Sequence, residues 1–320
     1  MALIDVFNGD ADGICAIHQI RLVEPAASTL ITGVKRDINL LKGLEVKAAD
    51  QVTVLDISLD KNRDDLMRIL DVGAKVRYFD HHFAGDIPQH RSLQAFIDTD
   101  ANICSSLLVN NYLDGRYLPW AVTAAFGDNL FISAEQAADP LNLSHEQLDQ
   151  LKLLGTLINY NGYGSSLEDL IYDPKQLYRL IAPYENPFDF INEAVAYTRL
   201  LQGYNTDMQQ ALSLKSYFEN EGHALFILPE AKWARRVSGV FANDMAQNYP
   251  DRAHALLTEK KDGAYLISVR APLNNKTGAD DLCRQFETGG GRKAAAGINH
   301  LPIDDFEKFQ NAFLKAFQAP

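Results

Sequence analysis

The chain is poor in cysteine, in long apolar runs and in positive charge. Its three cysteines, Cys15, Cys104 and Cys283, lie far apart with no Cys-x-x-Cys spacing, which favours buried, reduced thiols in a cytoplasmic protein. No apolar stretch reaches membrane-spanning length and the N-terminus does not resemble a signal peptide, so no membrane partner is expected. There are 30 Lys and Arg residues against 42 Asp and Glu, a net charge of −12. A broad basic surface for long nucleic acid is therefore not expected.

The 320 residues, 47% hydrophobic and 22% charged, are typical of a globular chain with room for two domains. In the first part, strand-like and helix-like segments alternate, which predicts an α/β fold with a mostly parallel sheet flanked by helices. A helical connection follows, and then a smaller α/β domain with a mixed sheet. The predicted boundaries are 1–185 for the N-terminal domain, 186–221 for the helical linker and 222–320 for the C-terminal domain.

Acidic residues and histidines follow several apolar segments that are expected to be parallel strands. They are Asp10 and Asp12 after residues 2–7, Asp56 after 51–55, Asp80, His81 and His82 after 74–79, and Asp128 after 122–126. Because the tips of parallel strands lie side by side, these side chains are expected around one cleft. Each aspartate alone could cap a helix or end a strand. Together, oxygen ligands with one or two imidazoles favour an Mn²⁺ or Mg²⁺ site over a structural zinc.

These motifs resemble those of the DHH phosphoesterases. The N-terminal part of the resemblance consists of Asp10-Ala11-Asp12-Gly13, Asp56, Asp80-His81-His82 and Asp128, in the family's order. Near the other end, residues 289–297 read Gly-Gly-Gly-Arg-Lys-Ala-Ala-Ala-Gly and resemble the glycine-rich signature of the DHH-associated C-terminal domain. The two matches anchor both parts of the chain.

The resemblance implies a metal-dependent phosphodiesterase of the nanoRNase type. Its substrates would be short linear oligonucleotides, chiefly 5′-phosphorylated dinucleotides such as pGpG or pApA, which it would cleave to mononucleotides in the turnover of cyclic-dinucleotide signals. Two Mn²⁺ sites are implied, with Mg²⁺ as the alternative ion. The implied ligands are Asn8, Asp10 and Asp56 for one ion, and Asp12, Asp56, His81 and Asp128 for the other. His82 would contact the scissile phosphate, and Asp80 would orient its neighbours.

Two positions depart from the family pattern. Asn8 stands where the family usually has a histidine ligand, and an amide oxygen binds a hard cation more weakly than an imidazole, so weaker binding of the first ion is expected. Arg292 stands where the glycine-rich signature commonly has a histidine. Arginine offers a fixed fork of donors, so phosphate binding could survive this exchange.

The candidate substrate-binding residues lie in the predicted C-terminal domain. Glycines let backbone N–H groups approach an anion closely, and arginines can bind it with two donors. The glycine run is expected to be a loop followed by an alanine-rich, helix-like segment. The resemblance implies that this domain faces the metal cleft and holds the far end of the substrate. The candidates are Arg270, Asn274, Arg284, Gly289, Gly290, Gly291, Arg292 and Lys293.

Other functions stay open. The chain could be a phosphatase for nucleoside 3′,5′-bisphosphates, or a non-catalytic nucleotide sensor, which only Asn8 suggests. A long-strand exonuclease is disfavoured by the acidic composition. The sequence decides neither the base preference nor whether the chain forms a homodimer. Residues 134–202 are expected to be helical, apart from a loop at 159–164, and their role is open.

Overall fold

The computed structural model describes residues 1–318, and the chain divides into two compact units, Met1–Gln202 and Gly203–Pro320. The predicted linker 186–221 contains two helices, α8 (Pro187–Glu193) and α9 (Val195–Leu212), of which α9 spans the division. The last two residues of the predicted C-terminal domain, 319–320, lie outside the described residues. Within residues 1–318, no helix is both long enough and apolar enough to cross a bilayer.

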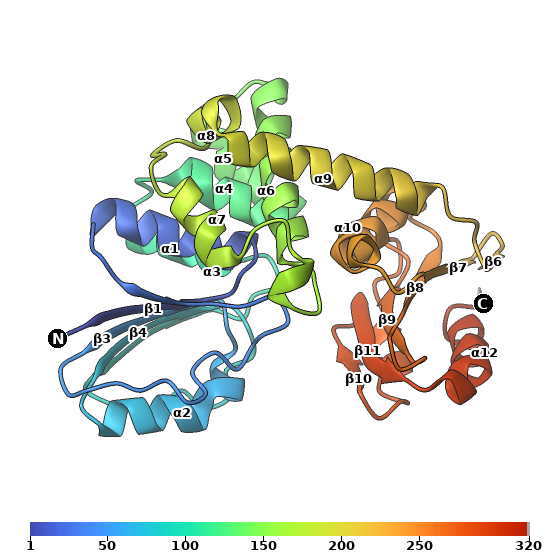
Figure 1. Cartoon of the computed structure of the whole chain (residues 1–320), viewed down its shortest axis with the longest axis horizontal. Helices are drawn as coiled ribbons and strands as arrows, with labels where there is room; N and C mark the ends of the chain where they lie inside the picture. Colours follow the sequence, from blue (N-terminus) through green and yellow to red (C-terminus); the bar gives the residue numbers. More distant parts are fainter. Residues whose placement is uncertain (319–320) are drawn as a thin grey trace. The chain divides into compact units, whose positions relative to one another are not determined.

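The N-terminal unit is built on a five-stranded parallel sheet with the strand order β2-β1-β3-β4-β5. Helix α2 lies on one face of this sheet, and helices α1, α3 and α4 lie on the other side (Figure 1). The elements are β1 (Leu3–Phe7), α1 (Ala11–Val23), β2 (Thr29–Ile31), β3 (Gln51–Leu55), α2 (Leu59–Asp71), β4 (Lys75–Asp80), β5 (Leu93–Ile97), α3 (Ser105–Tyr112), α4 (Leu118–Gly127), α5 (Phe131–Ala138), α6 (His145–Gly162) and α7 (Pro174–Ile181). The predicted parallel sheet flanked by helices is confirmed.

Alternating apolar residues attach α2 to the sheet. Every second strand residue points to the face that α2 covers, and Val6, Val54 and Tyr78 are fully buried there. They pack with Leu66 and Ile69, which recur at helical spacing along α2. A slip of one residue would turn each strand's apolar side chains to the opposite face, so this core fixes the register that aligns the strand ends.

Two sequence expectations in this unit are wrong. Residues 122–126, expected as a strand, lie inside α4, because a short apolar run does not distinguish a strand from a buried helix. Pro119 in the first turn and the alanines that follow favour the helix. Residues 159–162, expected as part of a loop, form the last turn of α6.

Helices α4 and α6 cross closely at two glycines. A Cβ atom on Gly155 would lie 2.1 Å from the carbonyl oxygen of Thr123, and one on Gly127 would lie 2.8 Å from the carbonyl oxygen of Gly155. The two backbones can approach this closely only because both residues lack a side chain. Asp128 follows α4 directly, and Asn159 lies one turn beyond Gly155, so the crossing fixes the places of both polar side chains.

The C-terminal unit has a six-stranded mixed sheet with the strand order β10-β11-β9-β8-β7-β6, in which only β7 and β8 pair in parallel among the described strands. Helix α10 lies on one face of this sheet and α12 on the other (Figure 1). The elements are β6 (Phe218–Glu219), β7 (His223–Leu228), α10 (Lys232–Asn248), β8 (Ala253–Glu259), β9 (Tyr265–Arg270), α11 (Ala279–Cys283), β10 (Gly289–Gly291), β11 (Ala295–Leu301) and α12 (Phe306–Ala316). The predicted mixed sheet is confirmed.

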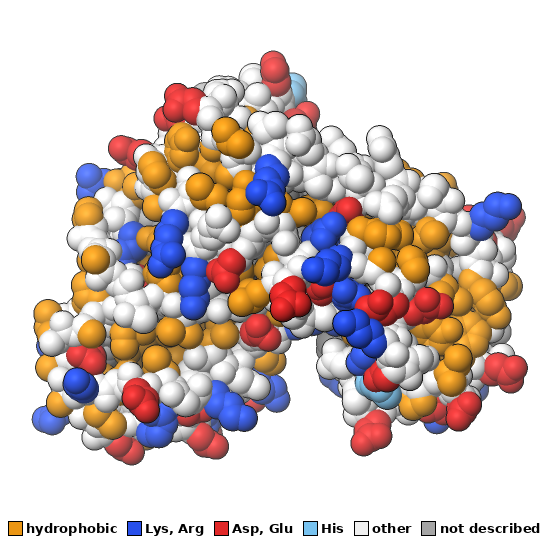
Figure 2. Space-filling model, viewed as in Figure 1, with side chains coloured by type: hydrophobic (Ala, Val, Ile, Leu, Met, Phe, Trp, Pro, Cys, Tyr) orange, Lys and Arg blue, Asp and Glu red, His pale blue; other side chains and the backbone are white. Residues whose placement is uncertain are grey.

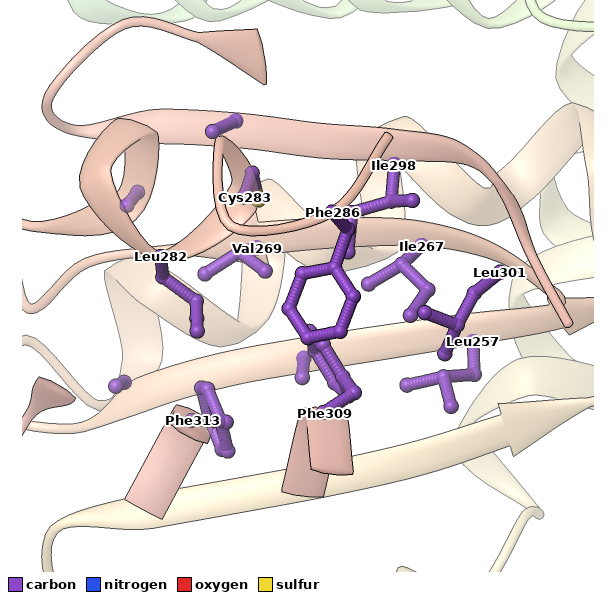
Figure 3. Packing of buried hydrophobic residues seen from close by; sticks show 14 of the residues in the cluster. Leu257, Ile267, Val269, Leu282, Cys283, Phe286, Ile298, Leu301, Phe309 and Phe313 are labelled. Carbon is purple, nitrogen blue, oxygen red and sulfur yellow. The ribbon is translucent and has the colours of Figure 1, made fainter. Parts of the chain in front are cut away.

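An aromatic core joins α11 and α12 to this sheet. Phe286 packs against Phe309 of α12, with ring centroids 5.8 Å apart, and Phe309 stacks with Phe313 at 6.1 Å (Figure 3). Ile267 and Ile298 lie beside these rings on neighbouring strands. Full burial of such side chains contributes about 1.5–3 kcal/mol each to the stability of the unit.

The glycine-rich run is a strand, and the segment after it is not helical. Residues 289–291 form the edge strand β10, which pairs antiparallel with β11. In β11, Ala296 and Ile298 are buried in alternation, which is the period of a strand and outweighs the helix propensity of alanine. A Cβ atom on Gly289 would lie 1.7 Å from the carbonyl oxygen of Cys283, so close packing against α11 explains this glycine.

Candidate functional site

Three parallel strands deliver polar residues to one edge of the N-terminal sheet. The last residues of β1 and β3 pair with each other, and β3 and β4 are likewise in register at this level. Asn8, Asp56 and Asp80 follow immediately and therefore leave the sheet together at its C-terminal edge. This is the edge at which open α/β sheets bind ligands.

Asp10 and Asp12 lie at the start of α1. Oδ1 of Asp10 accepts hydrogen bonds from the backbone N–H groups of Asp12, at 3.1 Å, and Gly13, at 3.2 Å, so Asp10 caps the helix. Asp12 reaches across to α3. Its two oxygens accept hydrogen bonds from the N–H groups of Ser105, at 2.8 Å, and Ser106, at 2.7 Å. The N-termini of two helices thus stabilise carboxylates in one place.

His81 is buried and directs one ring nitrogen toward the aspartates. Its Nδ1–H donates to the carbonyl oxygen of Ile103 at 2.9 Å, which leaves the lone pair on Nε2. This Nε2 lies 3.4 Å from Oδ1 of Asp56, 3.7 Å from Oδ2 of Asp128 and 4.0 Å from Oδ2 of Asp12. A lone pair and several carboxylates repel one another unless a cation or a proton lies between them.

His82 lies beside this group, and Asp80 holds its ring. Oδ1 of the fully buried Asp80 accepts hydrogen bonds from the backbone N–H of His82, at 3.1 Å, and from its Nδ1–H, at 2.7 Å. The other oxygen of Asp80 accepts a hydrogen bond from the N–H of Leu59 at 3.2 Å. Since the His82 side chain is still 34% exposed, the oriented ring is accessible to a substrate.

Two groups of three side chains are close enough to hold a divalent ion. In each group the potential ligand atoms lie within 4.8 Å of one another. One group is Asp12, His81 and Asp128, and the other is Asp56, His81 and His82. Asp128 reaches the first group from the end of α4 rather than from a fourth strand. The structure therefore brings together Asp12, Asp56, His81, His82 and Asp128, although Asp128 follows a helix and not the strand that was expected there.

Burial makes these aspartates difficult to ionise. Burial raises the pKa of Asp56 well above its ordinary value, and the neighbouring Asp12, Asp10 and Asp128 raise it further. The pKa of Asp12 is also raised, mainly by burial, although His81 acts in the opposite direction. Asp56 in addition has a left-handed backbone, with φ of 58°. A bound cation would favour the charged forms and relieve this repulsion.

Sequence reasoning missed Lys35, whose ammonium group lies among the same carboxylates. Its Nζ donates to Oδ2 of Asp10 at 2.5 Å and to Oδ1 of Asn159 at 2.9 Å, and lies 3.5 Å from Oδ1 of Asp128. Burial alone would lower the pKa of Lys35, but Asp10, Tyr163 and Asp128 raise it well above its ordinary value. The available signal was position, because Lys35 follows the C-terminal end of β2 in the same parallel sheet.

Of the two predicted ligand sets, the one for the second ion fits a divalent ion better than the one for the first. The first implied set, with Asn8 and Asp10, is incomplete. Oδ1 of Asn8 is buried without a hydrogen-bond partner, as a metal ligand would be, but Oδ2 of Asp10 is paired with the ammonium group of Lys35, a cation that would repel a metal ion there. The second implied set combines carboxylate oxygens with one imidazole nitrogen, as Mn²⁺ and Mg²⁺ prefer. Its members are Asp12, Asp56, His81 and Asp128.

Three of the predicted substrate-binding residues lie at one end of the C-terminal sheet. Arg270 pairs with the first residue of β11, and Arg292 and Lys293 lie in the tight turn that joins β10 to β11. The Arg270 side chain donates to Oδ1 of Asn243 at 2.8 Å. Over the region of α10 and β9, Figure 2 shows a run of Lys and Arg side chains with acidic side chains beside them.

The other predicted residues are spread over this unit. Arg284 follows α11 and pairs with Asp280 at 3.1 Å, and Asn274 hydrogen bonds Asp251 in a loop. Of the strand glycines, Gly290 has open space around it, because no atom lies within 4 Å of the position of a Cβ. The structure therefore brings together only part of the predicted set.

Comparisons with known proteins support the fold. Residues 220–319 match the DHHA1 domain. The whole chain is similar to a crystal structure of exonuclease RecJ bound to manganese, with 16% identity and a TM-score of 0.61 over 100% of this chain and 91% of that one. RecJ from Thermus thermophilus in complex with Mn²⁺ matches with 15% identity and a TM-score of 0.64, over 100% of this chain and 52% of that one.

A third similar structure is PggH, a pGpG-specific phosphodiesterase from Vibrio cholerae, with 15% identity and a TM-score of 0.56 over 99% of each chain. At these identities the likeness concerns the fold. No curated protein sequence matches the chain. The DHHA1 match and the RecJ-like fold support the resemblance that the motifs carry.

Proposed function

We propose that this chain is a DHH-family phosphoesterase, and within that family a metal-dependent phosphodiesterase for short linear oligonucleotides. The DHHA1 match and the RecJ-like fold support the family assignment. Its chief substrates would be 5′-phosphorylated dinucleotides, and its products mononucleotides. One observation carries the proposal, the convergence of three carboxylates on Nε2 of His81. That donor set suits Mn²⁺, with Mg²⁺ as the alternative.

The residues of the site have two roles, since some bind the ion and others position the substrate. When bound by Asp12, Asp56, His81 and Asp128, a divalent ion supplies an activated water and offsets the negative charge that develops on the phosphate. Asp80 fixes the ring of His82 through Nδ1, so that the ring can contact the scissile phosphate. The family resemblance implies a further ion at Asn8, Asp10 and Asp56.

A short substrate is favoured by the distribution of charge. Long strands bind through many phosphate contacts to a basic track, whereas this chain has a net charge of −12. We assign phosphate and nucleoside binding in the C-terminal unit to Arg270, Arg292 and Lys293, together with the open backbone at Gly290. The remaining candidates are Asn274, Arg284, Gly289 and Gly291.

The dinucleotide is proposed by analogy with one of the similar structures. PggH is described as pGpG-specific, so pGpG is the first substrate to test and pApA the second. Hydrolysis of either would give the chain a nanoRNase-type role in the turnover of cyclic-dinucleotide signals. Its three cysteines are free and buried, which supports the proposed cytoplasmic location.

A substrate panel tests this function. The protein is treated with excess chelator and then supplied with Mn²⁺ or Mg²⁺, and mononucleotide release is measured from pGpG, pApA and single strands of increasing length. We expect chelation to abolish activity, Mn²⁺ to restore it better than Mg²⁺, and rates to fall from two to about seven nucleotides. His82→Gln should be severely impaired, whereas His145→Gln, which changes an exposed histidine, should retain activity.

Each alternative function gives a distinct result in this panel. Full activity in excess chelator would reject the metal assignment. Release of phosphate from nucleoside 3′,5′-bisphosphates without cleavage of dinucleotides would identify a phosphatase. Dinucleotide binding without turnover under every metal condition would identify a sensor, and equal turnover per end on dimers and long strands would identify an exonuclease.

A further inference from the structure

The ammonium group of Lys35 is held as a fixed charge inside the candidate metal centre. An ammonium group has three N–H donors, and three acceptor oxygens surround this one. They belong to Asp10, Asn159 and Asp128, at 2.5, 2.9 and 3.5 Å from Nζ. Because its donors are all engaged within the chain, Lys35 is suited to holding these side chains in place rather than to binding a phosphate.

An ion bound by Asp10 would compete directly with this ammonium group. Oxygen ligands hold small divalent ions at about 2.1 Å, so an ion on Oδ2 of Asp10 would lie within about 5 Å of Nζ of Lys35. Two cations at that separation repel strongly in a buried site. The other oxygen of Asp10 caps α1 through the N–H groups of Asp12 and Gly13, and binding an ion there would disturb the cap.

Asn8 takes part in the same arrangement. Its Nδ2 donates to the carbonyl oxygen of Lys35 at 3.3 Å, and the N–H of Lys35 donates to the carbonyl oxygen of Gly162 at 2.9 Å. The residue that replaces the family's usual histidine ligand therefore supports the segment that carries the ammonium group. The amide at position 8 and the lysine at position 35 are therefore linked by a direct hydrogen bond.

We propose that Lys35 takes the place of the first ion, so that the chain binds one divalent ion, at Asp12, Asp56, His81 and Asp128. This inference rests on the proposed function and changes the two-ion expectation of the family resemblance. Lys35 is then a positioning residue, which keeps Asp10 and Asp128 in place without a second ion. Asp10 serves the helix cap and the ion pair instead of a metal.

Counting bound Mn²⁺ tests this without any substrate. Metal-free protein is titrated with Mn²⁺ by calorimetry, the bound metal is counted by elemental analysis, and electron paramagnetic resonance detects magnetic coupling between neighbouring ions. The variants are Lys35→Met, the double variant Asn8→His with Lys35→Met, and Lys42→Met as a control at an exposed lysine. We expect one ion in the wild type and in Lys42→Met, and two coupled ions in the double variant.

The wild-type count is decisive even if a variant fails to fold by circular dichroism. Two ions per wild-type chain would overturn the proposal, and one ion would support it. A folded double variant that still binds only one ion would also overturn it, because the ammonium group would then not be what excludes the first ion. One bound ion with no hydrolysis of any nucleotide would reject the proposed function and leave this ion count intact. No bound ion at all would reject both.

Discussion

Replacing Gly155 with alanine tests whether the crossing of α4 and α6 sets the geometry of the site. The new Cβ would lie 2.1 Å from the carbonyl oxygen of Thr123, whereas ordinary contact begins near 3.4 Å. The difference, 3.4 − 2.1 = 1.3 Å, must be met by moving one helix away from the other, since the obstructing atoms are backbone. Asp128 follows α4 directly, so the movement shifts its carboxylate relative to His81, which is now 3.7 Å away.

The size of both effects can be estimated. Overpacking of this kind costs about 1–3 kcal/mol. In a unit of roughly 200 residues that lowers Tm by about 2–12 °C. A ligand displaced by about 1 Å lowers kcat by about 10²-fold, and Mn²⁺ affinity should fall with it. The loss of activity should therefore exceed what the loss of stability alone would cause at a temperature where the variant stays folded.

Thermal unfolding by circular dichroism, Mn²⁺ titration and turnover of pGpG measure the three quantities. Gly222→Ala is the matched control, because a Cβ there would meet only one atom, at 4.0 Å, and the backbone is not left-handed. This variant should change the free energy of unfolding by no more than about 0.5 kcal/mol and should keep the wild-type Mn²⁺ affinity and turnover. If Gly155→Ala retains wild-type Tm, Mn²⁺ affinity and kcat, the crossing does not set the position of Asp128 and the reasoning fails.

Four further predictions concern single side chains. Asparagine tolerates the left-handed backbone at position 56, so Asp56→Asn should fold. It should lower kcat by at least about 10²-fold but raise the Tm of the metal-free protein, because it removes a carboxylate that burial disfavours. Unchanged turnover would contradict this prediction. Burial lowers the pKa of His18 from 6.5 to about 4. The fold is therefore most stable above pH 6.5, where the ring is neutral, and its free energy of unfolding should fall by roughly 3 kcal/mol as the pH decreases toward 4. Urea unfolding at pH 7 and pH 4.5 should show that loss in the wild type and much less of it in His18→Gln. Arg292→Ala should raise KM for dinucleotides more than it lowers kcat, and a fall in kcat alone would argue against a binding role. Phe83 follows His82 and is 74% exposed, so Phe83→Ala should weaken dinucleotide binding by about 1–3 kcal/mol if the ring stacks on a base, whereas Phe83→Tyr should not.

The strand ends of the N-terminal unit were predictable because local sequence specifies them. Apolar strands of similar length end in Asp56 and in Asp80-His81-His82, and a parallel sheet places such ends at one edge. Asp128 was correctly expected among the metal ligands, but it was expected after a strand and instead follows α4. An apolar run of five residues is compatible with both a strand and a buried helix. Its position depends on the crossing of α4 and α6, which no local pattern reveals.

The remaining contacts of the site depend on tertiary structure. Lys35 and Asn159 are 124 residues apart, and nothing near either one indicates that they hydrogen bond. The glycine-rich run was singled out for its composition, but its conformation as an edge strand depends on pairing with β11 and on packing against α11. Sequence motifs thus indicated the chemistry, and long-range packing decided which side chains meet.

The left-handed backbone of Asp56 has a consequence for evolution and engineering. Glycine would relieve the strain of this conformation, and either glycine or asparagine would remove a buried carboxylate that three other aspartates disfavour. Both changes should therefore be enriched when a library of variants is selected only for thermal stability in the absence of metal. Stabilised variants from such a selection should be inactive. Homologues that carry Gly or Asn at this position should likewise lack hydrolytic activity.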